Sequence, residues 1–193
     1  MRLLNLILIL LLLSGCLSKY QNSIEHVSVA DTVNYTLLPT IPFSNGLTLT
    51  QSATVTYQDE SHDLIFHTEI TNRQLTMVGL SPTGTRLFTI MMQEGTVNAE
   101  GFSSMIDAIK PEYLLADLQL SLWPQEQINQ NLSGANVEEV DSLTRSLVQN
   151  NDTIIIIRYS EEERFKGDIQ FTHHQRGYNL SLTPLSIEFS NDE

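Results

Sequence analysis

The residue with the most distinctive chemistry in this chain is Cys16, its only cysteine. Arg2 supplies a positive charge, residues 3–13 are almost entirely apolar, and two small residues come just before the thiol. A charged start, a short apolar core and a small-residue boundary are the features of a secretory signal peptide. The sequence therefore predicts a signal peptide over residues 1–15 and a thiol at the start of the mature chain.

Two other interpretations of this apolar run are weaker. A transmembrane helix needs about 20 apolar residues, roughly twice the number found here. A buried core helix could have this length, but it does not account for a lone cysteine at the point where the apolar run stops.

Residues 13–16, with the sequence LSGC, also resemble the lipobox of bacterial lipoproteins. The resemblance implies cleavage before Cys16, a diacylglycerol on its sulfur, and a palmitate-type acyl chain on the new amino group. Leu17 replaces the aspartate that resembles an inner-membrane retention signal, so we expect the outer membrane and its periplasmic face. Multiple acyl chains anchor a protein firmly.

The search for catalytic chemistry is negative. The sequence has no G-x-S-x-G elbow, phosphate loop, dinucleotide fingerprint or zinc-binding helix motif. His173 and His174 are adjacent, so on a strand they point to opposite faces and cannot share a metal ion. We therefore expect no enzyme activity, no metal and no cofactor. A convergent hydrolase or transferase, with Ser81 or Ser133 near a histidine, is the least supported alternative.

Charge and length limit the class of protein. The net charge of −13 repels phosphate backbones, so nucleic acid is not an expected partner. About 178 residues remain after cleavage, which favours one domain. We assign residues 16–26 to a lipidated N-terminus and polar tether, and residues 27–193 to a single domain.

Alternating apolar and polar residues predict a run of strands in the first half of this domain. Residues 47–57 place Leu47, Leu49, Ala53 and Val55 on one face and a row of hydroxyl side chains on the other. Similar patterns follow, joined by short turns, at residues 64–70, 75–80 and 86–92. This spacing is typical of an antiparallel meander.

The middle of the chain changes to helical spacing. Helices are predicted over residues 103–110 and 111–123, where Leu114, Leu115, Leu118 and Leu122 recur on one side and Trp123 follows. These side chains either fill the core or form a lid over an apolar cavity, because both roles require the same spacing. Met77, Met91 and Met92 are likewise either adaptable cavity walls or core residues.

Strands return near the C-terminus, and the apolar parity shifts after Pro184, which predicts a bulge or an edge. The predicted fold is mainly antiparallel β with a helical insertion, in the α+β class. About ten strands make a sheet large enough to curl. A curled sheet with helices across its mouth encloses an apolar space.

Several stretches resemble the DUF3261 family of bacterial lipoproteins, whose members are often encoded with aryl-polyene biosynthesis enzymes. They are residues 37–39, 79–88, 114–120 with Trp123-Pro124, 145–159 and 177–180. The layout is also similar to LolA and LolB, which are half-barrels closed by helices around an acyl-chain cavity.

The resemblance implies a non-enzymatic protein at the outer membrane. It would bind acyl chains in an apolar cavity, accept lipids or acylated cargo from a LolA-like periplasmic carrier, and insert them into the membrane; an aryl-polyene lipid is one expected cargo. The alternative from another class is a structural or assembly lipoprotein with a filled core and a protein partner.

Overall fold

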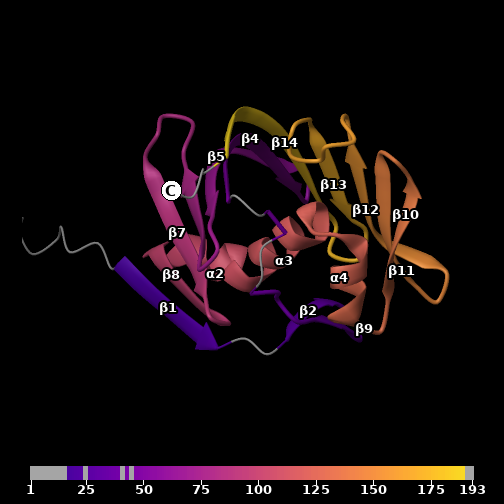
Figure 1. The fold of residues 1–193 in the computed structure, drawn as a ribbon. Helices are drawn as coiled ribbons and strands as arrows, with labels where there is room; N and C mark the ends of the chain where they lie inside the picture. The colour runs from indigo at the N-terminus through magenta and orange to yellow at the C-terminus, as the bar shows by residue number, and fades with distance from the viewer. Residues whose placement is uncertain (1–16, 24–25, 40–41, 44–45, 190–193) are drawn as a thin grey trace, which may run out of the picture.

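The computed structural model describes residues 17–23, 26–39, 42–43 and 46–189. It confirms the predicted fold class: a curved, mainly antiparallel sheet covers helices inserted between its two halves (Figure 1). Eleven strands within these ranges form one sheet, in the order β1-β8-β7-β6-β5-β4-β14-β13-β12-β11-β10. No helix within them has the length and apolar character that crossing a bilayer requires.

Most of the first half of the sheet is an antiparallel meander, and four of its strands match the alternation predicted at residues 47–57, 64–70, 75–80 and 86–92. Its strands are β1 (Leu17–Ser23), β4 (Leu47–Tyr57), β5 (Glu60–Ile70), β6 (Leu75–Leu80), β7 (Arg86–Gln93) and β8 (Thr96–Phe102). The helices follow as α2 (Ser103–Ile109), α3 (Pro111–Leu122) and α4 (Gln125–Gln130). The second half contains β10 (Asn136–Asp141), β11 (Thr144–Gln149), β12 (Asp152–Tyr159), β13 (Ile169–His173) and β14 (Tyr178–Glu188).

Strand β14 joins the two halves, because it pairs with both β13 and β4. Its pairing with β4 is long, and the register shifts between Pro184 and Ser186. This irregularity confirms the bulge predicted from the parity change at the proline. Proline lacks the N–H that a regular ladder position requires.

Two segments differ from the sequence interpretation. Residues 17–23 lie in the stretch interpreted as a tether, but they form the edge strand β1, which pairs with β8. An ion pair joins the two strands, with Nζ of Lys19 3.3 Å from Oε1 of Glu100. An edge strand is held mainly by backbone hydrogen bonds, so its side chains can be polar. No element was predicted over residues 125–140, which form α4, β9 (Leu132–Ser133) and β10. Strand β9 lies in a small sheet with β2 (Val27–Ala30) and β3 (Val33–Tyr35).

Helix α3 lies in the hollow of the sheet and carries much of the core (Figure 1). Every residue from Leu115 to Leu122 is buried, including the polar side chains of Asp117, Gln119 and Ser121. A helix buried on all sides is surrounded by protein, and its polar side chains need partners there.

Candidate functional site

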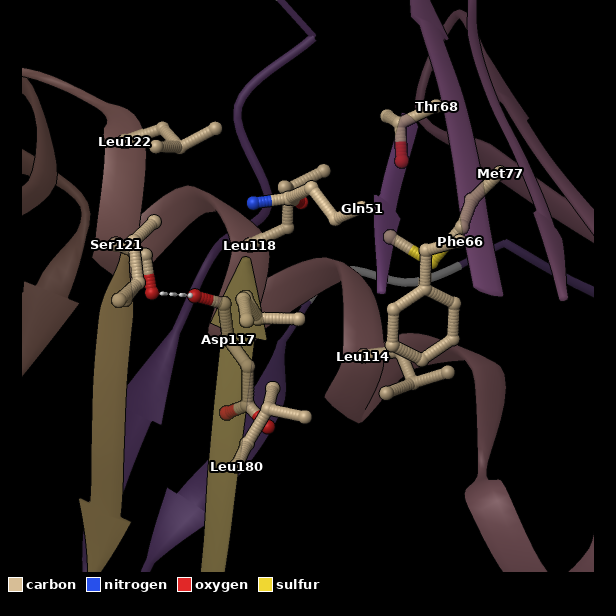
Figure 2. Close-up of a pocket in the computed structure, with 12 residues that line it drawn as sticks. Gln51, Phe66, Thr68, Met77, Leu114, Asp117, Leu118, Ser121, Leu122 and Leu180 are labelled. Carbon is tan, nitrogen blue, oxygen red and sulfur yellow. Dashed lines mark hydrogen bonds between the residues drawn. The ribbon is translucent and has the colours of Figure 1, made fainter. Parts of the chain in front are cut away.

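The candidate site is a cavity between α3 and the concave face of the sheet, at the junction of the two sheet halves (Figure 2). Its volume is about 30 Å³, which is enough for one water-sized group. Strands supply one wall and α3 supplies the other. The lining residues are Gln51, Phe66, Thr68, Met77, Leu114, Asp117, Leu118, Ser121, Leu122, Ile169, Leu180 and Leu182.

The strand wall contains two polar residues in otherwise apolar rows. Gln51 lies between Leu49 and Ala53 on the inner face of β4, and Thr68 follows Phe66 on the inner face of β5. Both are almost fully buried, at 2 % and 1 % exposed. Neither the Gln51 amide nitrogen Nε2 nor the Thr68 hydroxyl Oγ1 has a hydrogen-bond partner. Leaving such a group unpaired costs about 1–3 kcal/mol.

The helical wall contributes a buried carboxyl group. Asp117 accepts a hydrogen bond from the phenol of Tyr178 on β14, at 2.5 Å. Burial raises the pKa of Asp117 to about 7, although this bond and the charge of Arg176 act in the opposite direction. Near neutral pH this carboxyl group is therefore only partly ionised.

The carboxyl end of α3 is fastened by four buried hydrogen bonds. Gln119 accepts hydrogen bonds from the Tyr35 hydroxyl and the Leu38 amide, and donates to the Leu38 carbonyl, each at 2.9 Å. The guanidinium of Arg145 donates to the Leu120 carbonyl at 2.5 Å. The Arg145 bond satisfies a carbonyl group at the end of the helix that would otherwise be unpaired, and a cation there also complements the helix dipole.

The last turn of α3 has a further partner, since the Tyr159 phenol donates to the Ser121 carbonyl at 2.8 Å. Arg145 itself is held by Glu139, with its Nη2 atom 2.7 Å from Oε1. The buried guanidinium thus has a carboxylate partner, which a buried charge requires.

The amino end of α3 is held by more exposed contacts. The Tyr20 hydroxyl donates to Glu112 at 3.1 Å, and the Arg176 guanidinium stacks on the Tyr113 ring at 3.8 Å from its centre. Lys110, between α2 and α3, has a φ of 47°, which is unusual for a residue with a side chain. The helix is therefore attached more firmly at its carboxyl end than at its amino end.

The structure divides the residues predicted as cavity or lid. Met77, Leu114, Leu118 and Leu122 line the cavity together. Leu115, Trp123 and Met92 are buried elsewhere in the packed core, and Trp123 contacts Phe43 edge to face. Met91 is half-buried and has the opposite parity from Met92, so it faces the outer side of the sheet. Cys16, the predicted lipid attachment site, lies outside the described residues.

Sequence reasoning missed the polar members of the site, Gln51, Thr68 and Asp117. A signal was available, because Gln51 and Thr68 have the parity of apolar neighbours on their strands. Asp117 likewise lies one helical turn from Leu114, on the same side of α3. A polar residue at an apolar position is informative, since burial without a partner is costly.

The histidines and serines considered for chemistry have other surroundings. His173 is buried and His174 is exposed, which confirms their opposite orientation. Nε2 of His173 donates to the Val29 carbonyl at 2.8 Å, while Nδ1 accepts from the Arg176 amide. Ser81 lies in a turn with Thr83. In the part of the chain that the structure describes, no cluster of three histidine, cysteine, aspartate or glutamate side chains is placed to hold a metal ion.

One protein family matches most of this chain. The family described as protein of unknown function DUF3261 matches residues 48–186, which is more than half of the chain. The chain belongs to the DUF3261 family. No curated protein sequence matches it.

Among solved structures, this DUF3261 chain is similar to a LolA superfamily protein from Nitrosomonas europaea, with 9% identity and a TM-score of 0.45, covering 80% of this chain and 90% of that one. It is also similar to an outer membrane lipoprotein-sorting protein domain from Vibrio parahaemolyticus, with 8% identity and a TM-score of 0.40. That match covers 75% of this chain and 85% of the other. Similarity at this level carries no information about ligand or activity.

Four of the stretches that carry the DUF3261 resemblance meet at α3. The helix itself contains residues 114–120, and Gln119 binds the Leu38 backbone. Arg145 and Tyr159 both bind its last carbonyls, and Tyr178 binds Asp117. The fifth stretch, residues 79–88, forms the β6–β7 hairpin. In this chain, four of the five stretches thus contribute to the fastening of one helix inside a curved sheet.

Proposed function

We propose that this protein is an outer-membrane lipoprotein without enzyme activity that binds acyl chains between α3 and the concave face of the sheet. The observation that carries this proposal is the cavity, where mostly apolar side chains surround two unpaired polar groups, Gln51 and Thr68. An apolar wall with a few convergent polar groups is the usual make-up of a small-molecule site.

Binding requires movement of α3, because the cavity holds about 30 Å³ and ligand pockets usually have about 300–1,000 Å³. The amino end of the helix has the more exposed contacts, through Glu112 and Tyr113, so this end moves while the contacts of Gln119 hold the other end. Burying a chain of a dozen carbons contributes on the order of 10 kcal/mol, which offsets the separation of the walls.

The anchor determines where this happens. We propose that Cys16 is lipidated and holds the domain at the periplasmic face of the outer membrane, where it accepts acylated cargo from a soluble carrier of the LolA kind and delivers it to the bilayer. An aryl-polyene lipid is one cargo to test. Replacing Cys16 with serine should abolish palmitate labelling and release the protein from the membrane fraction.

The direct test of acyl binding uses the chain from residue 17 onward, which retains every described residue. Native mass spectrometry after gentle purification should detect a co-purified lipid, and the protein should take up a fluorescent fatty acyl probe. Leu114→Arg places a charge at the cavity and should abolish uptake. Leu87→Arg changes a half-buried leucine on the outer face of β7 and should retain it.

The small size of the cavity also favours a second candidate, a structural or assembly lipoprotein that uses its surface to bind a protein partner. In that case neither bound lipid nor probe uptake will be detected, and a stoichiometric protein will co-purify from outer membranes. That combination of results would overturn the acyl-binding proposal.

A further inference from the structure

The unpaired groups in the cavity define the kind of atom they would bind. Within the described ranges, three buried side-chain atoms lack a hydrogen-bond partner: Gln51 Nε2, Thr68 Oγ1 and Glu139 Oε2. The third lies 2.8 Å from the Arg164 guanidinium, so its charge is balanced by an ion pair. The two without any compensation are the two that line the cavity.

Gln51 and Thr68 are neighbours on the strand wall of the cavity. In the β4–β5 register Gln51 lies opposite Phe66, and Thr68 is the next residue on the same face of β5. Such diagonal neighbours on adjacent strands are about 7–8 Å apart at the backbone, and both side chains line the same cavity. An amide nitrogen and a hydroxyl both donate hydrogen bonds, so the complementary ligand atom is an acceptor.

The electrostatics of the cavity favour an uncharged acceptor. No lysine, arginine or histidine is among the described residues that line it, and its one ionisable group is the carboxyl of Asp117. Burial already opposes the negative charge of Asp117, as the direction of its pKa shift shows. A carboxylate ligand would add a second buried anion without a counter-charge, which costs several kcal/mol.

We infer that Gln51 and Thr68 recognise the carbonyl oxygen of an ester- or amide-linked acyl chain, and that the cavity discriminates against free fatty acids. The volume of about 30 Å³ fits a carbonyl-sized group. The hydrocarbon chain beyond it would lie against the leucines of α3 once the helix has moved. This inference rests on the proposed acyl-binding function and specifies its ligand class.

The experiment compares three twelve-carbon ligands in competition with the fluorescent acyl probe, using the chain from residue 17 onward. Monolauroylglycerol has the ester carbonyl, dodecylglycerol ether has the same chain and head group without the carbonyl, and laurate has a charged carboxylate. The ester should bind about tenfold more tightly than the ether, the difference expected for one to two hydrogen bonds. Laurate should bind more weakly than the ester.

The double variant Gln51→Leu with Thr68→Val should lose the preference for the ester and keep the affinity for the ether. Replacing unpaired polar groups with apolar ones of similar shape is neutral or stabilising for folding, and thermal unfolding of the variant checks this. Thr48→Val, on the outer face of β4, is the matched control and should keep the preference.

The possible failures are distinguishable. If ester and ether bind equally, as expected when a water molecule occupies the cavity and bridges Gln51 and Thr68, carbonyl recognition is wrong and acyl binding stands. The same conclusion follows if the double variant still prefers the ester, or if laurate binds more tightly than the ester. If none of the three ligands competes, the proposed function fails as well.

Discussion

The phenol of Tyr178 on β14 donates a hydrogen bond to the carboxyl of Asp117 on α3, and so ties the central helix to the strand that joins the two halves of the sheet. Burial and the neighbouring carboxyl raise the pKa of Tyr178, so this group remains the donor. The contact places a titratable group in the core, and its consequences can be measured.

Replacing Asp117 with asparagine should change how stability depends on pH. Folding raises the pKa of Asp117 from 3.8 to about 7, so between these values the folded state binds more protons and this group's contribution to stability falls as pH rises. Relative to the native chain, Asp117→Asn should therefore gain stability, by about 4 kcal/mol from acidic to neutral pH. Urea unfolding over this range measures it, with the exposed Asp107→Asn as control; equal pH profiles would contradict the prediction.

Replacing His173 should have the opposite effect on the pH profile. Burial lowers the pKa of His173 from 6.5 to about 4, so the unfolded chain binds more protons between these values and stability rises with pH. His173→Gln should remove this rise, worth about 3 kcal/mol. The same unfolding series measures it, and the exposed His174→Gln should keep the native profile.

These two contributions oppose one another over nearly the same pH range. The free energy of unfolding of Asp117→Asn should rise with pH over this range, because only His173 still contributes. That of His173→Gln should fall with pH, because only Asp117 still contributes. Slopes of the same sign in the two variants would show that at least one of the groups does not titrate as its burial predicts.

Removing the Arg145 side chain should loosen the carboxyl end of α3. Arg145→Met leaves the Leu120 carbonyl and the Oε1 atom of Glu139 without their donor, and breaking a buried pair costs about 3–5 kcal/mol. Arg164→Met removes the more exposed partner of Glu139 and should cost less, about 1 kcal/mol. The free energy of unfolding in urea distinguishes them, and equal losses would contradict the role given to Arg145.

Adding a methyl group at Gly79 should disturb the β6–β7 hairpin. Gly79 lies opposite Phe88, and a Cβ atom there would be 2.3 Å from atoms of the buried ring. Gly79→Ala should therefore destabilise the protein by about 1–3 kcal/mol, and Phe88→Leu should recover part of this loss by removing the clash.

Gly84→Ala is the matched control for this pair. Its φ of 85° is unfavourable for a residue with a side chain, but no atom lies within 4 Å of the position that the added Cβ would take. Its cost should be about 1 kcal/mol, and Phe88→Leu should not reduce it. A double-mutant cycle in thermal or urea unfolding checks both, and rescue at Gly84 would show that the effect is not a contact with the ring.

The sequence by itself determined the strands and helices whose side-chain period is local. Alternation over residues 47–57 reflects burial on one face of a strand, and the leucine spacing over residues 111–123 is typical of a helix, so both elements were correctly predicted. The bulge at Pro184 was also visible, because a missing N–H and a parity change are local properties. Strand β1 was missed because an edge strand needs no apolar period.

Only the tertiary structure decided which residues meet. Arg145, Tyr159 and Tyr178 are distant from α3 in the chain, yet all three bind it, because β14 pairs with β4 and curves the second half of the sheet around the helix. The unpaired state of Gln51 and Thr68 is likewise a property of the packed core. A sequence can place a polar residue on an apolar face, but whether that residue has a partner depends on contacts across the fold.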